Sequence, residues 1–155
     1  MPNKLSRRAR RRKRIASTVL SLAKSHRQES QFLQLVTKKF PQTERIGEGL
    51  YREVYSLSDD LVLKIENGTY STAQEVAARK VRGNRNYTVP ILASHLDENF
   101  SIIVARKAEL VETDVDDRRL KRLRDRFYDI HEQNIGVFEG RLVAIDTGCG
   151  MRPAA

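Results

Sequence analysis

Near its end, the chain reads Asp129-Ile130-His131-Glu132-Gln133-Asn134, a polar stretch that comes directly before two short apolar runs. The two runs are joined by Glu139-Gly140, a residue pair that is typical of a tight hairpin turn. The hairpin returns the chain to Asp146-Thr147-Gly148, so the sequence predicts that Asn134 and Asp146 lie close together. Asp and Asn are also common loop formers that bond their own backbone. Taken alone, this motif leaves a structural and a functional role equally open.

A second, independent pattern lies upstream, where the chain reads Ile46-Gly47-Glu48-Gly49-Leu50-Tyr51-Arg52-Glu53-Val54. Lys64 follows ten residues after Val54 in a strand-like run, and Glu75 follows eleven residues later, near a predicted helix start. Glycines let the backbone approach a phosphate closely, and a lysine contacts phosphate oxygens. A Gly-x-Gly turn is frequent, however, and a lysine on an edge strand is more often a solvated charge. The evidence is therefore the order in which these features occur.

In this order the features resemble the protein-kinase-like superfamily, particularly the branch with aminoglycoside and choline kinases, whose loops favour Asp-Leu-His-x-x-Asn. Small phage-encoded kinase-like proteins are also similar, and the resemblance covers about residues 44–148. It implies a phosphotransferase that uses ATP and Mg²⁺ and acts on a protein Ser/Thr side chain or on itself. The implied roles are catalytic base for Asp129, phosphate binding for Lys64, pairing with this lysine for Glu75, nucleotide contacts for Gly47, Gly49 and Val54, and Mg²⁺ ligands for Asn134 and Asp146. The resemblance also implies that Gly148 lets the chain turn sharply, and His131 is expected to support the loop by hydrogen bonding.

Several residues depart from the pattern of that family. Arg52 stands at the third glycine position of the phosphate loop, where its side chain is expected either to contact phosphate or to point into water. Phe127 stands where many protein kinases have the histidine of His-Arg-Asp, and Thr147 replaces an aromatic residue. Only nine residues follow Asp146, so most of the usual large lobe is expected to be missing. The N-terminal helices, a partner or a second copy would then cover the surface that this lobe buries.

The pattern of apolar residues predicts an α+β fold with an N-terminal helical extension, a kinase-like N-lobe and a minimal catalytic-loop hairpin. The N-lobe is expected to contain a five-stranded antiparallel sheet and one helix. The expected segments are a basic arm at 1–14, the extension at 15–40 and a kinase-like domain at 41–155, divided into an N-lobe at 41–110 and a C-terminal part at 111–155. The expected strands are 43–46, 53–57, 61–65, 89–93 and 101–105, and helices are expected at about 71–82, capped by Ser71 or Thr72, and at 114–128.

Positive charge is concentrated at the start of the chain. Residues 1–40 contain twelve Lys or Arg and one acid, Glu29, a balance of +11 within a total net charge of +9. Residues 1–14 have no apolar periodicity and are expected to be disordered until they meet a partner. The run at residues 7–14 predicts binding to a polyanion or nucleic acid through the release of counterions.

Composition excludes several classes of protein. A single cysteine, Cys149, excludes an internal disulfide and a cysteine-rich zinc site. The sequence contains no apolar run of about eighteen residues, so no membrane partner is expected. A weak export signal and an organelle transit peptide remain open for the basic start. A cytoplasmic location is expected, that of the host cell if the source is viral.

Three functions remain open from the sequence. The first is an active kinase, and the second is a pseudokinase effector that engages a partner protein and binds nucleotide without turnover. The third is a nucleic-acid-binding protein that uses its basic arm. A homo-oligomer is compatible with each of them.

Overall fold

The computed structural model describes residues 5–49, 51–111, 114–148, 150 and 152. Four helices are present among them: α1 (Arg7–Ser25), α2 (Glu29–Lys39), α3 (Tyr70–Lys80) and α4 (Asp117–Arg124). The strands are β1 (Glu44–Glu48), β2 (Arg52–Ser58), β3 (Leu61–Glu66), β4 (Ile91–His95), β5 (Ser101–Arg106), β6 (Glu109–Leu110), β7 (Ile135–Phe138) and β8 (Arg141–Ala144). Short 3₁₀ turns at Asn84–Tyr87 and Glu132–Asn134 precede the segments that return to the sheets.

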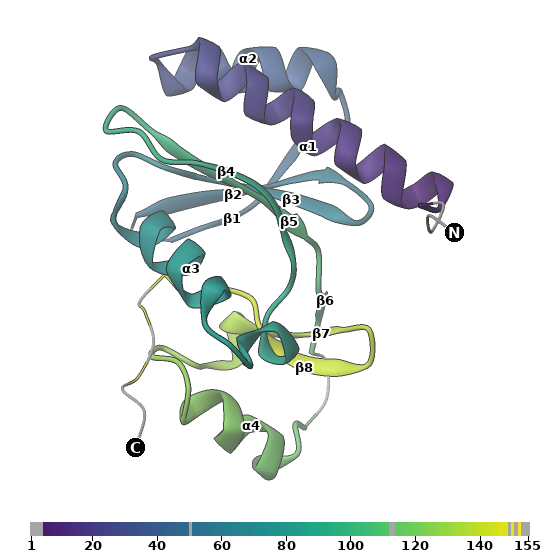
Figure 1. Cartoon of the computed structure of the whole chain (residues 1–155), viewed down its shortest axis with the longest axis vertical. Helices are drawn as coiled ribbons and strands as arrows, with labels where there is room; N and C mark the ends of the chain where they lie inside the picture. The colour runs from purple at the N-terminus through teal and green to yellow at the C-terminus, as the bar shows by residue number, and fades with distance from the viewer. Residues whose placement is uncertain (1–4, 50, 112–113, 149, 151, 153–155) are drawn as a thin grey trace.

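The central feature is a five-stranded antiparallel sheet with the order β1-β2-β3-β5-β4. A smaller sheet, β6-β7-β8, lies below it (Figure 1). The predicted α+β fold with a five-stranded antiparallel sheet is confirmed, and it is consistent with a kinase-like N-lobe. Strand β6 was not predicted, because two residues are too short a segment to show an alternation of polar and apolar side chains.

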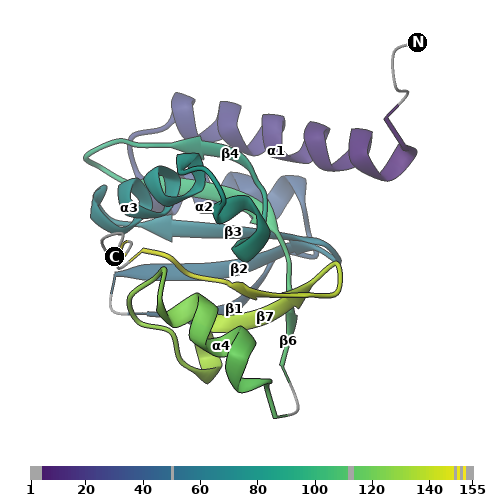
Figure 2. The same ribbon diagram turned by 60° about the horizontal axis from the view of Figure 1, so that its bottom comes forward.

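The register of β2 and β3 decides which side chains share a face of the sheet. Val54 lies opposite Lys64 and Arg52 lies opposite Glu66, so these four side chains point to one face. The residues that alternate with them, Leu63 among them, point to the other face. Helices α1 and α2 cover this second face, whereas α3 and the β7–β8 hairpin lie on the first (Figure 1, Figure 2).

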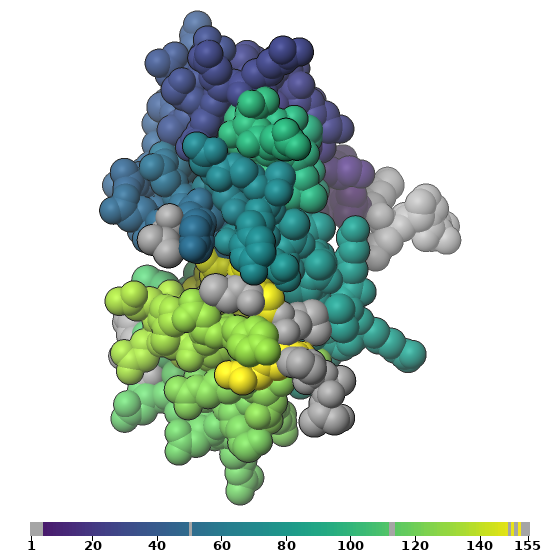
Figure 3. Space-filling view, turned by 90° about the vertical axis from the view of Figure 1, so that its left-hand side faces the viewer, coloured from purple at the N-terminus to yellow at the C-terminus, as the bar shows by residue number. Residues whose placement is uncertain are grey.

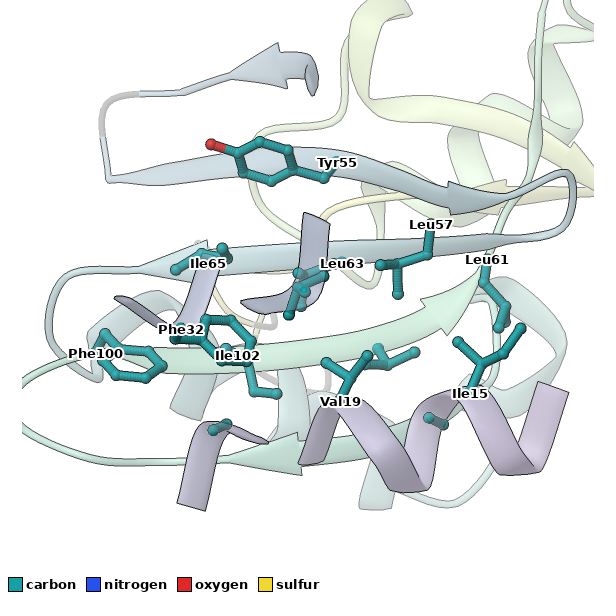
Figure 4. Packing of buried hydrophobic residues seen from close by; sticks show 14 residues of the cluster. Ile15, Val19, Phe32, Tyr55, Leu57, Leu61, Leu63, Ile65, Phe100 and Ile102 are labelled. Carbon is teal, nitrogen blue, oxygen red and sulfur yellow. The ribbon is translucent and has the colours of Figure 1, made fainter. Parts of the chain in front are cut away.

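The core beneath the N-terminal helices is built from aliphatic and aromatic side chains. Val19 of α1 and Phe32 of α2 are fully buried, and the Phe32 and Phe100 rings stack with their centroids 5.1 Å apart (Figure 4). Every residue of β3 is buried, because both faces of this strand are covered. The N-terminal extension is thus part of the fold and not an appendage to it.

The structure corrects the expectation of a disordered arm. Residues 7–14 form the first two turns of α1, and the Ser6 side chain caps this helix by accepting from the Ala9 amide. The like charges of this segment disfavour a helix in isolation, but it continues a helix whose later turns are anchored in the core. Arg12 also bonds Asp60 at 2.9 Å, in the turn between β2 and β3. Residues 1–4 lie outside the described part of the chain.

Two other helices differ from the prediction. Helix α3 is capped by Glu66, whose carboxylate accepts from the Ser71 and Thr72 amides at 2.8 and 2.7 Å, and neither of those residues is the cap. Helix α4 is shorter than the expected 114–128 at both ends: Asp116 caps its start by accepting from the Arg118 amide, and Asp125 follows its last residue. Among the described residues, no helix has the length and apolar character needed to cross a membrane.

Candidate active site

Three cations surround one buried carboxylate on the face of the sheet that looks toward the β7–β8 hairpin. Lys64 Nζ donates to Glu75 Oε1 at 2.6 Å, and Arg52 Nη1 donates to Glu75 Oε2 at 2.7 Å. Arg79, one helical turn after Glu75, lies 3.4 Å from Oε1. Burial raises the pKa of Glu75, but the charges of Lys64, Arg52 and Arg79 outweigh it and hold this pKa at about 2. Glu75 is therefore ionised at all physiological pH values.

Lys64 connects this cluster to the end of the hairpin. Its ammonium group donates a second hydrogen bond, to the backbone oxygen of Ile145 at 2.7 Å. Ile145 directly precedes Asp146, so the strand lysine and the candidate metal ligand lie side by side although they are 82 positions apart in the sequence. Burial lowers the pKa of Lys64, and the neighbouring carboxylates of Glu75 and Asp146 oppose this effect.

Asn134 joins the two acidic residues of the predicted motif. Its Nδ2 donates to the backbone oxygen of Asp129 at 2.6 Å, and its Oδ1 accepts from the Asp146 amide at 2.7 Å. The Asn134 backbone oxygen also accepts from the Ile145 amide. The sequence predicted Asn134 as a metal ligand, and the structure places its buried side chain as the connection between the loop and the hairpin.

Asp129 adopts a left-handed backbone conformation with φ of 58°, which turns the chain sharply before the 3₁₀ turn. Its side chain is more than half exposed, and Oδ1 lies 3.7 Å from His131 Nε2. His131 thus lies beside the loop carboxylate, at a distance too long for a direct hydrogen bond. A cavity of about 910 Å³ lies beside this loop and is lined in part by Leu120, His131 and Glu132.

Arg52 is the site residue whose position the sequence left undecided. Its side chain is 5% exposed and contacts Asp146 Oδ1 through Nη2 while Nη1 holds Glu75, so the expectation that it points into water is wrong. Burial lowers the pKa of Arg52, but Glu75 and Asp146 raise it above its ordinary value. Arg52 lies two residues before Val54, so the two side chains point to the same face of the sheet, and Val54 pairs with Lys64. This spacing was the sequence feature that could have predicted the position of Arg52. Arg79 was missed, although it lies four residues after Glu75 within the predicted helix, a spacing that indicates an ion pair.

The glycines and valine of the upstream motif lie on β1, β2 and the turn between them. Gly49 N donates to the Arg52 backbone oxygen at 2.7 Å, and Gly47 pairs with Val54 across the two strands. A side chain added to Gly47 would meet Val54 Cβ at 4.0 Å, so the space around this glycine is open. Val54 is half-buried above the apolar cluster that contains Phe138. Leu50 lies outside the described residues.

The carboxylate of Asp146 and the amide oxygen of Asn134 match the oxygen ligands that Mg²⁺ prefers, but one oxygen of each side chain already accepts hydrogen bonds within the protein. Asp146 Oδ1 accepts from Arg52 and from the Gly148 amide, and Asn134 Oδ1 accepts from the Asp146 amide. Among the described residues, no group of three or more His, Cys, Asp or Glu side chains is arranged around a common point. The Arg52 guanidinium thus lies against the carboxylate that the sequence assigned to a metal ion.

Gly148 lies in the expected turn, which is closed by a hydrogen bond from the Gly150 amide to the Thr147 backbone oxygen at 2.9 Å. A Cβ at this position would lie 2.7 Å from Arg52 Nη2 and 2.9 Å from Asp146 Oδ1. Both atoms take part in ion pairs, so moving either one away would break an ion pair. The absence of a side chain at Gly148 therefore allows the Arg52–Asp146 contact to form.

Replacing Gly148 with alanine is expected to lower the free energy of unfolding by about 1–3 kcal/mol, because the added methyl group overpacks this contact. Urea unfolding followed by circular dichroism measures the change. Gly47→Ala is the matched control, because its new methyl group meets only an ordinary contact with Val54. Equal stability of the two variants would contradict the close approach at Gly148.

Comparison with known proteins gives a fold and no family. No protein-family model matches the chain, and no curated protein matches it. Among solved structures, it is similar to the one described as a co-crystal structure of WbdD and the kinase inhibitor LY294002, with a TM-score of 0.50 and 15% sequence identity. The likeness indicates a kinase-like fold. The likeness covers 68% of this chain and 32% of the WbdD chain. This chain therefore spans about a third of the length of that WbdD chain.

The structural neighbour bears on the fold alone. It supports the resemblance to kinase-like proteins, whereas the aminoglycoside and choline kinase branch and a phage origin remain predictions. The structure brings together Lys64, Glu75, Asn134 and Asp146, and it places Asp129 at the far side of Asn134. The chemical roles of these residues remain predictions as well.

Proposed function

We propose that the chain binds a nucleoside triphosphate and transfers its terminal phosphoryl group to a hydroxyl. The observation that carries this proposal is the hydrogen bond from Lys64 to the Ile145 backbone oxygen, because it brings the proposed phosphate-binding cation next to Asp146. Asn134 then connects Asp146 to Asp129, the candidate base. A cation, a candidate metal ligand and a candidate base from three parts of the chain are thus joined by consecutive hydrogen bonds.

In the proposed reaction, Lys64 contacts phosphate oxygens while Glu75 holds its ammonium group in place. Asp129 accepts the proton of the acceptor hydroxyl as the acceptor oxygen bonds to the terminal phosphorus. The bond between that phosphorus and the bridging oxygen breaks, and the nucleoside diphosphate leaves with the electron pair. The proposed acceptor is a protein Ser/Thr side chain or the chain itself.

Arg52 has to leave its position for this reaction to occur. Lys64 is only 2% exposed, and the guanidinium of Arg52 contacts both Glu75 and Asp146 beside it. A triphosphate offers Arg52 a new anionic partner, so we propose that it moves from Asp146 to the phosphates when nucleotide binds. Asp146 and Asn134 are then the proposed ligands of Mg²⁺, whose charge offsets that on the phosphate oxygens.

Thermal unfolding with and without nucleotide tests the pocket before any acceptor is known. With a non-hydrolysable ATP analogue and Mg²⁺ at about 100 times Kd, the expected stabilisation is about 2.7 kcal/mol, or roughly 5–10 °C in Tm. Lys64→Met is expected to abolish the shift, whereas Lys121→Met on the exposed face of α4 is expected to retain it. Equal melting temperatures with and without the analogue for the wild type would refute nucleotide binding.

One observation favours a second function, that of a pseudokinase effector. Arg52 contacts Asp146, and Asn134 uses its amide group within the protein, so the candidate metal ligands are both engaged. If Arg52 stays in place when nucleotide binds, stabilisation by the ATP analogue is expected to be independent of Mg²⁺. An Mg²⁺-dependent shift favours the phosphotransferase instead.

A further inference from the structure

The largest group of exposed cations lies on α1, which covers the opposite face of the five-stranded sheet from Lys64 and Glu75. It consists of exposed cations of α1 together with one from the end of α2, and we name it the basic surface. Its members are Arg7, Arg8, Arg10, Arg11, Lys13, Arg14 and Lys39. Figure 3 shows α2 at one end of the molecule, the segment of α4 at the other, and the dark purple start of α1 between them. Helix α1 contains no Asp or Glu, and its one half-buried arginine in this region, Arg12, is paired with Asp60.

The charges of the basic surface are placed where they lower the stability of the helix. The first turn of a helix carries the positive end of its dipole, which favours acids and disfavours Arg and Lys. Helix α1 has no acid in this turn and has six exposed cations within its first two turns. Like charges at these spacings also repel one another. An anionic partner would remove this cost.

The helix holds these cations in fixed directions. Ile15, Ala16, Val19 and Ala23 are buried against the sheet, so the opposite side of α1 faces outward (Figure 2). Arg7, Arg11 and Arg14 follow one another at i, i+4 and i+7, on one stripe. At a rise of about 1.5 Å per residue, this stripe is about 10 Å long. One strand of a duplex has a phosphate about every 3.4 Å of axis, so the stripe spans about three phosphates.

A groove extends the stripe onto α2. A cavity of about 440 Å³ is lined by Arg11, Arg14, Thr18, Lys39 and Gln42, together with Ile15 and Phe40. Three of these residues are cations, two offer polar side chains and none is an acid. The groove is therefore shaped by two helices and suited to an anion that contacts Arg11, Arg14 and Lys39 together.

We propose that the basic surface binds the phosphate backbone of nucleic acid without reading its sequence. The spacing of the arginines and the row of cations fit a regular line of phosphates. Insertion into an anionic membrane needs an apolar face, and that of α1 is already buried in the core. Stacking on bases needs aromatic side chains, and α1 has none. The proposal does not depend on the phosphotransferase function.

Fluorescence anisotropy with a 20-base-pair DNA duplex of arbitrary sequence, between 50 and 200 mM salt, tests the proposal. The triple variant Arg11→Ala, Arg14→Ala and Lys39→Ala is expected to bind at least tenfold more weakly at low salt. The slope of log K against log salt is expected to fall by about 0.9 for each lost phosphate contact, or roughly 2.7 for three contacts. A second duplex of unrelated sequence is expected to give the same constants.

The matched control removes three exposed arginines of α4, by the changes Arg118→Ala, Arg119→Ala and Arg122→Ala. It alters the net charge equally and is expected to leave affinity and slope close to those of the wild type. Equal losses in the two triple variants would overturn the proposal, because net charge alone would then explain binding. Tighter binding to phosphatidylserine vesicles than to DNA at equal phosphate, or full displacement of DNA by polyglutamate at equal charge, would overturn it as well.

Discussion

Replacing Glu75 with glutamine is expected to lower the free energy of unfolding by about 3–5 kcal/mol, the largest change in stability that we expect from a single substitution. Glu75 is fully buried and contacts Lys64, Arg52 and Arg79. Glutamine keeps the shape of the side chain but removes the charge, so three cations face one another with Asp146 as their remaining carboxylate. Part of that repulsion is relieved if a cation leaves the interior, which also disrupts the contacts around Asp146.

Urea unfolding of the two proteins at pH 7 measures this effect. Glu98→Gln, in the exposed turn between β4 and β5, is the matched control and is expected to change stability by less than about 0.5 kcal/mol. Similar unfolding midpoints for the Glu75 and Glu98 variants would show that the buried cluster contributes little to the fold.

The same carboxylate predicts how stability depends on pH. The pKa of Glu75 is about 2 in the folded protein and 4.5 in its unperturbed state. A carboxyl group with a lowered pKa stabilises the fold above its unfolded pKa, and this contribution is lost as the pH falls through the folded pKa. Glu75 is therefore expected to contribute about 3 kcal/mol at neutral pH, and this is lost between about pH 4.5 and pH 2. The Glu75→Gln variant is expected to lack this part of the acid dependence.

Asp129→Asn is expected to lower the rate of phosphoryl transfer by about 10²- to 10⁴-fold, because the variant has no carboxylate to accept the proton of the acceptor. Nucleotide affinity is expected to stay within a factor of about two, since Asp129 lies on the far side of Asn134 from Lys64. Asparagine is the informative substitution here, because Asp129 has a left-handed φ that asparagine tolerates and most other residues do not. The fold and the Asn134 contact to the backbone oxygen are therefore retained.

Transfer of labelled phosphate from ATP in the presence of Mg²⁺, to a general protein acceptor and to the chain itself, measures this rate. Asp125→Asn is the control, since Asp125 is exposed at the end of α4 and pairs only with Lys121 among the contacts described for its side chain. Transfer by Asp129→Asn at the wild-type rate would remove this residue from the mechanism. Nucleotide binding without transfer in any of the three proteins would favour the pseudokinase alternative.

Much of the site was predictable because its residues follow local rules. The glycine turn, the strand lysine and the helix glutamate occur in the order of kinase-like proteins. This resemblance implied contact between Lys64 and Glu75, whose charged atoms lie 2.6 Å apart. The hairpin turn at Glu139-Gly140 predicted that Asp146 returns to Asn134, and these two residues are hydrogen-bonded. The second prediction depends on turn chemistry and spacing along the chain, whereas the first depends on the resemblance.

The position of Arg52 and the state of residues 7–14 depend instead on tertiary contacts. The like charges of residues 7–14 predict disorder for this segment. Helix α1 nevertheless includes these residues, because its later turns are packed in the core and Arg12 donates to Asp60. Arg52 is buried because Glu75 and Asp146, from two distant segments, supply it with partners. A buried cation is stable only where such partners exist, and its own neighbours in the sequence do not indicate them.

The amino-acid sequence by itself thus determined the α+β architecture and the five-stranded sheet, since these follow from side-chain periodicity and turn chemistry. The candidate catalytic residues came from its resemblance to kinase-like proteins. Only the tertiary structure decided that α1 is ordered from Arg7 and that Arg52 lies against Asp146. The reason is physical: burial and charge pairing are properties of segments brought together in space, and they override the preferences of each segment alone.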